Sequence, residues 1–279
     1  MEIALQFVLL ALGFVMLGKG ADWFVEGAAG IAMRFGIPQL VIGLTIVAMG
    51  TSAPEAAVSI AAAVKGNADI TIGNILGSNI LNILVILGLA ASIVPIAVAR
   101  STVRIEIPFM IGVTALLFYQ GRDGSISLAD GGVLMVAFAA YMMYLYTMAM
   151  KSNVDSDLEE PGLPLGRCLL GAVGGLALII AGSNITVGAA TSIATYAGLS
   201  ERFIGLTIVA LGTSLPELFT SVAAARRGNA DIAIGNIVGS NIFNILFVVG
   251  LSSLIIDIPF ASAFNFDTYV CLLYTSDAA

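Results

Sequence analysis

Long apolar segments separated by short polar turns run along almost the whole chain. They predict helices at about 3–30, 39–64, 69–95, 103–120 and 127–150, and again at about 167–197, 202–226, 230–256 and from about 266 onward. A helix needs roughly 20 apolar residues to cross the hydrocarbon core of a bilayer. The pattern therefore predicts eight complete membrane spans and the start of a ninth.

The pattern occurs twice along the chain. Residues 43–88 and 205–250 align at a fixed offset of 162 and are identical at 32 of 46 positions. A polar linker containing Pro and Gly, residues 152–166, separates a first repeat at 1–151 from a second at 167–279. Because five helices per repeat is an odd number, the second repeat must enter the membrane in the opposite orientation. We therefore predict an all-α polytopic membrane protein with two inverted-topology five-helix repeats.

The same offset places the last helix of the second repeat beyond residue 279. We expect ten transmembrane helices in the full protein and a chain truncated within helix 9. Seven Lys and Arg residues lie in the short loops on one side of the membrane and three on the other. Since positive loops stay in the cytoplasm, we expect a plasma (inner) membrane protein with its N-terminus outside and the linker 152–166 cytoplasmic.

The composition narrows the possible chemistry. Hydrophobic residues make up 59% of the chain and charged residues 10%, and the mean hydropathy is +1.03. There is no histidine, and the two cysteines are isolated, so we expect neither a disulfide framework nor a zinc, copper or haem site. Lys and Arg form no stripe or cluster, which argues against nucleic acid as a partner. The expected surroundings are the lipid bilayer, with the chain functional as a monomer.

Each repeat carries an acidic residue inside an apolar helix, in the motifs GTSAPE and GTSLPE. Pro54 has no amide hydrogen and its ring crowds the carbonyl four residues earlier, so we expect the helix to open there. Carbonyls around Thr51 then become available, and Glu55 lies one turn away on the same face. Thr213 and Glu217 repeat this arrangement. The inverted repeat can thus bring two half-sites together.

Carboxylates, carbonyls and hydroxyls form an all-oxygen ligand set that suits Ca²⁺ or Na⁺, and two glutamates balance one divalent ion. The following helix of each repeat adds a polar stripe, made of Asn74, Ser78 and Asn82 in the first and Asn236, Ser240 and Asn244 in the second. These stripes can complete the coordination shell or link helices by hydrogen bonds. GxxxG patterns at Gly73 and Gly77, and at Gly235 and Gly239, indicate close helix packing.

Other charged residues have structural interpretations. Asp22 and Glu26 lie near Lys19 on the first predicted helix and can neutralise it, although a role in an ion path stays open. Arg226 and Arg227 lie at a helix C-terminus, where the helix dipole favours them. We assign these two arginines no chemistry.

The paired GTSAPE and GTSLPE motifs, each followed by GNAD and then by IGNILGSNILN or IGNIVGSNIFN, resemble the two alpha-repeats of sodium/calcium exchangers. These belong to the calcium/cation antiporter superfamily, and GADWFVEGA in the first helix resembles its prokaryotic members. The resemblance covers the chain up to about residue 267. It implies ten helices in two inverted halves, with ion sites clustered between helices 2, 3, 7 and 8.

By motif position, the resemblance implies that Glu55 and Glu217 are the central acidic ligands, with the Thr51 and Thr213 carbonyls completing a calcium site. The residues implied for the flanking sodium sites or their access paths are Ser52, Ser78, Ser214, Ser240 and the carbonyls of Ala48 and Ala210. Asn82 and Asn244 would lie at the centre. Many family members have Asp at the position of Asn244, so this chain lacks one possible charge or proton site, and the counter-ion stays open.

The expected function is a secondary active antiporter, not an enzyme, that exchanges Ca²⁺ for Na⁺ by alternating access. The resemblance implies electrogenic exchange. Both ions are transported substrates, and no cofactor is expected. A proton/Ca²⁺ antiporter could use the same glutamates as proton carriers. A passive cation channel would not need a paired broken-helix site, and an intramembrane hydrolase would have to rely on a Ser-Lys pair, since histidine is absent.

Overall fold

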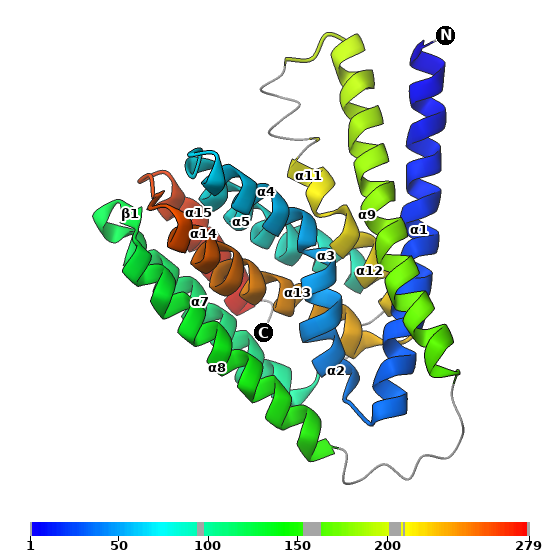
Figure 1. The fold of residues 1–279 in the computed structure, drawn as a ribbon, viewed down its shortest axis with the longest axis horizontal. Coiled ribbons are helices and arrows are strands. Elements are labelled where there is room, and N and C mark those ends of the chain that lie inside the picture. Colours follow the sequence, from blue (N-terminus) through cyan, green and yellow to red (C-terminus); the bar gives the residue numbers. More distant parts are fainter. Residues whose placement is uncertain (1, 94–97, 153–162, 201–207, 209, 278–279) are drawn as a thin grey trace.

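The computed structural model describes residues 2–93, 98–152, 163–200, 208 and 210–277, and these residues are almost entirely helical. Two long helices, α1 (Glu2–Phe35) and α9 (Leu165–Tyr196), pack side by side along one flank of the molecule (Figure 1). Their contact depends on glycines. A Cβ atom on Gly27 would lie 2.4 Å from the backbone nitrogen of Ala172, and one on Gly175 would lie 2.5 Å from that of Phe24. Only residues without side chains allow this approach.

The first copy of the repeat begins with a broken helix. Its segments are α2 (Gln39–Ile42), the π-helix η1 (Gly43–Val47), α3 (Ala48–Thr51) and α4 (Ala53–Val64). The two parts of this span meet at Ser52 and are bent by 50°. The next span consists of α5 (Asp69–Leu81), the π-helix η2 (Asn82–Leu87) and α6 (Gly88–Ile93).

An antiparallel helix pair forms the flank opposite α1 and α9 (Figure 1). It consists of the π-helix η3 (Thr102–Glu106), α7 (Ile107–Gln120), the short η4 (Gly121–Asp123) and α8 (Leu128–Ser152). Between them, β1 (Ser125–Ile126) pairs with β2 (Ile258–Pro259), with Ile126 opposite Ile258. The helical periodicity of the chain did not predict these two strands.

The second copy reproduces the plan of the first. Its segments are α11 (Ala210–Thr213), α12 (Leu215–Arg226), α13 (Ala230–Phe243), the π-helix η6 (Asn244–Val249), α14 (Gly250–Ile255) and α15 (Phe264–Asp277). The helix break at Ser214 and the π-helix at Asn244 fall 162 residues after those at Ser52 and Asn82. The predicted start of this copy, residues 202–207, and most of the predicted linker, residues 153–162, lie outside the described residues.

Helix α13 lies at the centre of the molecule. Six described helices are long and apolar enough to cross a membrane, or seven if the bent pair counts as one span. The α13 span has 94% of its apolar window buried, whereas those of α1 and α8 have 17%, so the latter two face outward. A Cβ on Gly235 would lie 2.9 Å from the Cα of Gly43, so the two copies can pack this closely only because Gly235 has no side chain. This confirms the packing role predicted for the GxxxG pattern at Gly235 and Gly239. The fold is the predicted all-α polytopic membrane protein with inverted repeats.

Candidate cation site

The helix break has the same geometry in both copies. Ser52 has φ −82° and ψ 7°, and Ser214 has φ −89° and ψ 4°. Pro54 and Pro216 lie in the first turn of the helix that follows, where a missing amide hydrogen costs no helical hydrogen bond. The predicted opening of the helix is therefore confirmed, but it occurs at the serine two residues before the proline. Glu55 consequently lies in the first turn of α4, near the positive end of the helix dipole, which favours a carboxylate.

The two glutamates are fully buried and are hydrogen-bonded by the opposite copy. Ser52 Oγ donates to Glu217 Oε1 at 2.8 Å, and Ser214 Oγ donates to Glu55 Oε1 at 3.4 Å. The side chain of Thr213 also interacts with the Glu55 carboxylate. The broken helices of the two copies thus cross at the motif, and each supplies a hydroxyl to the other's acid.

The flanking serines differ between the copies. Ser78 Oγ on α5 donates to Glu55 Oε1 at 3.5 Å, whereas Ser240 Oγ on α13 donates to the Ala48 carbonyl at 3.4 Å. Thr51 Oγ1 donates to Asn236 Oδ1 at 2.9 Å. Ala210 is the first residue of α11, as Ala48 is of α3. The structure therefore places the hydroxyls of Ser52, Ser78 and Ser214 on the glutamate carboxylates. Ser240 lies instead against the Ala48 carbonyl, and Thr51 against Asn236.

One asparagine of each stripe anchors the broken helix. Asn74 Nδ2 donates to Ser59 Oγ at 2.9 Å and to the Glu55 carbonyl at 3.3 Å. Asn236 Nδ2 makes the same two bonds in the second copy, to Ser221 Oγ at 2.9 Å and to the Glu217 carbonyl at 3.4 Å. These two residues link helices, which is the structural alternative considered for the stripes.

Four further asparagines meet between the copies. Asn79 Nδ2 donates to the Asn241 carbonyl at 3.2 Å, and Asn241 Nδ2 donates to the Asn79 carbonyl at 3.3 Å. Asn82 Nδ2 donates to Asn241 Oδ1 at 2.9 Å, and Asn244 Nδ2 donates to Asn79 Oδ1 at 3.1 Å. The sequence reasoning missed Asn79 and Asn241, although both stand in the repeated SNxxN pattern.

Four buried oxygens at this centre have no hydrogen-bond partner within the described part of the chain. They are Oε2 of Glu55, Oε2 of Glu217, Oδ1 of Asn82 and Oδ1 of Asn244. A buried acceptor without a partner is costly, and oxygen ligands with two negative charges are what a hard cation requires. Among the described residues no three His, Cys, Asp or Glu side chains cluster, so the acidic part of the site consists of these two glutamates.

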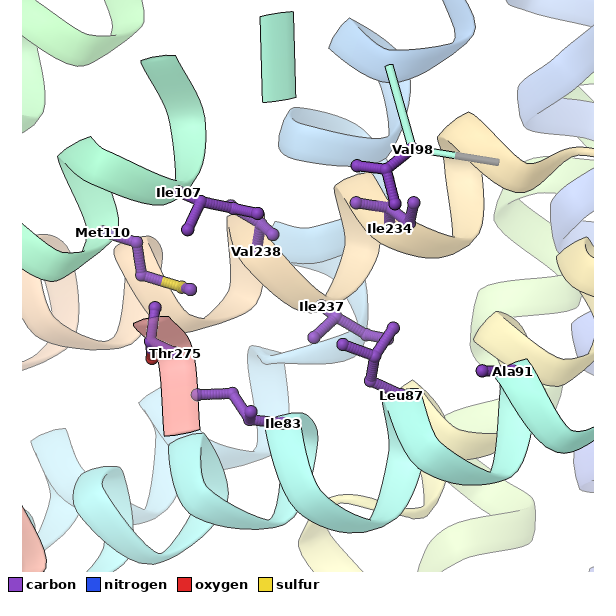
Figure 2. Close-up of a pocket in the computed structure, with 10 residues that line it drawn as sticks. All are labelled: Ile83, Leu87, Ala91, Val98, Ile107, Met110, Ile234, Ile237, Val238 and Thr275. Atoms are coloured by element: carbon purple, nitrogen blue, oxygen red, sulfur yellow. The ribbon is translucent and has the colours of Figure 1, made fainter. Parts of the chain in front are cut away.

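An apolar cavity of about 220 Å³ lies between η2, α7, α13 and the end of α15, and none of the candidate ligands lines it (Figure 2). Nine of its ten lining residues are apolar. The tenth, Thr275, donates its hydroxyl to the Cys271 carbonyl at 2.6 Å. The cavity therefore lacks the oxygen ligands that a cation site needs.

Two charged features differ from the sequence interpretation. Asp22 and Glu26 pair with Arg227, with its Nη1 3.2 Å from Glu26 Oε2 and its Nε 3.6 Å from Asp22 Oδ1, so the suggested pairing with Lys19 was wrong. Glu106, which the sequence reasoning passed over, is buried in η3, and its Oε1 accepts a hydrogen bond from Tyr144 at 2.5 Å. A lone acid inside an apolar span was the signal for it.

Comparison with known proteins identifies the family. The model of the sodium/calcium exchanger protein family matches residues 5–147 and 168–276. The chain belongs to this family. It is 42% identical to a putative antiporter, CaxA, of Alkalimonas amylolytica, over 99% of this chain and 88% of the relative. It is 34% identical to the sodium/calcium exchanger MaX1 of Methanosarcina acetivorans, over 90% and 83% respectively.

The fold agrees with this membership. A solved structure of the sodium-calcium exchanger NCX_Mj superimposes with a TM-score of 0.86 at 34% identity, covering 98% of this chain and 89% of that one. The resemblance stated from the paired motifs is thereby confirmed, and the chain is a multi-pass membrane protein of a family of cation/Ca²⁺ antiporters rather than of enzymes.

Proposed function

We propose that this antiporter exchanges Ca²⁺ for Na⁺ at one centre shared by its two inverted copies. The observation that carries the proposal is the pair of buried carboxylates, Glu55 and Glu217. Each is held by a serine of the opposite copy, and each has one oxygen without a hydrogen-bond partner among the described residues. Two relatives agree with it, since MaX1 is named a sodium/calcium exchanger and NCX_Mj is described as undergoing extracellular ion exchange with induced binding-site occlusion.

The proposed ligands are two charged carboxylates and a larger set of neutral oxygens. Glu55 and Glu217 supply the negative charge, and the carbonyls of Thr51 and Thr213 complete the Ca²⁺ site. The proposed sodium ligands are Ser52, Ser78, Ser214, Ser240 and the carbonyls of Ala48 and Ala210, with the amide oxygens of Asn82 and Asn244 at the centre. Carbonyls at the C-terminal end of α3 are suited to a cation because that end of a half-helix carries partial negative charge.

The buried charge explains why transport is an exchange. Two ionised carboxylates without a cation are costly inside a membrane, so the empty site cannot readily pass through an occluded state. Either Ca²⁺ or Na⁺ removes that cost, and the two ions therefore compete for the same glutamates. We propose a ratio of three Na⁺ to one Ca²⁺, as the resemblance implies, and exchange in that ratio moves net charge across the membrane.

The long pair α1 and α9 acts as the gate in this proposal. The two helices contact each other along their length, and α1 also contacts α12. Sliding of this pair past the broken helices would expose the site to one side of the membrane and then to the other, which is alternating access. Ser183 of α9 donates to the Gly212 carbonyl at 2.8 Å, so the gate touches the second broken helix directly.

A proton/Ca²⁺ antiporter is the second candidate. Asn244 is neutral, and the same two glutamates can carry protons in place of Na⁺. Ca²⁺ uptake by the full chain, reconstituted into Na⁺-loaded vesicles with a proton ionophore present, distinguishes the two functions. We expect Ca²⁺ uptake that follows the Na⁺ gradient, whereas uptake that ignores this gradient would refute Na⁺ coupling.

The site assignment has its own test with a matched control. Glu55→Gln and Glu217→Gln should each abolish Ca²⁺ uptake, because each removes half of the compensating charge. Glu106→Gln replaces another buried acid, one that lies outside the centre, and should leave uptake close to normal. Transport that persists in both central variants would overturn the assignment.

We also propose an extracellular N-terminus, a cytoplasmic linker at 152–166 between repeats 1–151 and 167–279, and a monomer in the plasma membrane. The excess of Lys and Arg in the loops on one side supports this orientation. A cysteine placed in the linker should react with a membrane-impermeant thiol reagent only after the cells are opened. Labelling of this cysteine in intact cells would show that the linker is extracellular and would refute the proposed orientation.

A further inference from the structure

We propose that Asn79 and Asn241 are positioning residues, which turn the amide oxygens of Asn82 and Asn244 toward the cation. The inference rests on the proposed function, because it concerns the same centre. In the described part of the chain, neither side chain is hydrogen-bonded to the four oxygens that lack a partner. Each acts through the amide of one central asparagine.

A backbone carbonyl can only accept a hydrogen bond. Asn79 Nδ2 donates to the Asn241 carbonyl, so Asn79 Oδ1 must point the other way, toward Asn244. That oxygen is also an acceptor only, so Asn244 must present its Nδ2 there. Turning over the Asn244 amide would bring two acceptors together. Asn244 Oδ1 is therefore held on the side away from Asn79.

The equivalent bonds of the second copy orient Asn82. Asn241 Nδ2 donates to the Asn79 carbonyl, which leaves Asn241 Oδ1 to accept from Asn82 Nδ2. Asn82 Oδ1 is thus held in the equivalent orientation. All four amides are buried, so in this conformation their hydrogen bonds are shielded from solvent. The orientation of the four amides is fixed at both ends by the backbone carbonyls of Asn79 and Asn241, which can only accept hydrogen bonds.

The amide oxygens of Asn82 and Asn244 belong to elements that pack against the helices that carry Glu55 and Glu217. The π-helix η2, which starts at Asn82, contacts α12 with Glu217, and η6, which starts at Asn244, contacts α4 with Glu55. Both amide oxygens and one oxygen of each glutamate are buried without a partner in the part of the chain that is described. Four acceptors of this kind in one region are satisfied together by a cation.

The test measures binding of Ca²⁺ and of Na⁺, each alone, to the purified full chain by calorimetry. Asn79→Ala and Asn244→Ala should each weaken binding of at least one cation by about tenfold, the scale expected for losing one oriented hydrogen bond. If Asn79 acts through Asn244, adding Asn79→Ala to Asn244→Ala should weaken binding little further, by less than about threefold.

A control cycle pairs Asn74→Ala with Asn244→Ala. Asn74 lies on the same helix as Asn79 and is also hydrogen-bonded, but none of its bonds described above reaches the four-asparagine network. Its effect should therefore add to that of Asn244→Ala.

Should Asn79→Ala fail to fold, Asn241→Ala combined with Asn82→Ala tests the same positioning role in the other copy. Additive losses for both cations in the Asn79 and Asn244 cycle would overturn the positioning role. A wild-type chain that binds neither cation would instead overturn the proposed function.

Discussion

The contact between α1 and α9 can be tested with two glycines of the same helix. A Cβ on Gly27 would lie 2.4 Å from the backbone nitrogen of Ala172 and 2.5 Å from the carbonyl oxygen of Cys168. A Cβ on Gly18 would have no neighbouring atom within 4 Å. Gly27→Ala must therefore push the helices apart, whereas Gly18→Ala fills open space.

The expected magnitudes follow from these distances. An ordinary contact needs about 3.4 Å, so Gly27→Ala requires the helices to separate by roughly 1 Å, a gap that forfeits up to about half of each neighbouring contact's attraction. Overpacking of this kind costs about 1–3 kcal/mol. Replacing Gly by Ala in a helix also contributes up to about 1 kcal/mol of stabilisation, and Gly18→Ala isolates that contribution. The free energy of unfolding of the two variants should thus differ by about 1–3 kcal/mol, with Gly27→Ala the less stable.

The chain provides its own probe for this measurement. Trp23, its single tryptophan, lies on α1 one turn before Gly27, beside a cavity of about 480 Å³ that residues of α1 and α9 line together. Thermal unfolding in detergent, followed by Trp23 emission, reports on this interface. At about 2–4 °C per kcal/mol, Gly27→Ala should unfold several degrees below Gly18→Ala. Equal midpoints, or a higher one for Gly27→Ala, would refute the packing argument.

Two further predictions concern charged groups away from the centre. Tyr144→Phe leaves the buried Glu106 carboxyl without its donor and should lower the free energy of unfolding by about 1–3 kcal/mol, whereas Tyr146→Phe, at an exposed tyrosine, should have no effect in the same thermal assay. Equal midpoints for these two variants would show that this hydrogen bond adds no stability. Arg227→Ala removes partly exposed ion pairs with Asp22 and Glu26 and should cost less than about 1 kcal/mol, a loss that high salt should mask in a denaturation series. A larger loss that persists in high salt would contradict this.

Much of the fold could be predicted from local properties of the chain. The length of each apolar segment decides whether it can span a bilayer, and the offset of 162 makes the two copies equivalent without any knowledge of packing. Proline chemistry predicted the broken helices, and the rarity of acids in apolar helices singled out Glu55 and Glu217. The same reasoning missed Asn79 and Asn241, because a polar residue that faces a partner helix has the same spacing as one that does not.

What the sequence by itself determined is therefore the set of spans, their inverted repetition and the residue types of the centre. Only the tertiary structure decided which atoms meet. Ser52 stands three residues before Glu55 in the same broken span, yet it donates a hydrogen bond to Glu217 of the other copy. Arg227, likewise, pairs with Asp22 and Glu26 on α1, more than two hundred residues earlier in the chain. A repeat in sequence establishes that two half-sites are alike, but the crossing of the helices establishes which half completes the other.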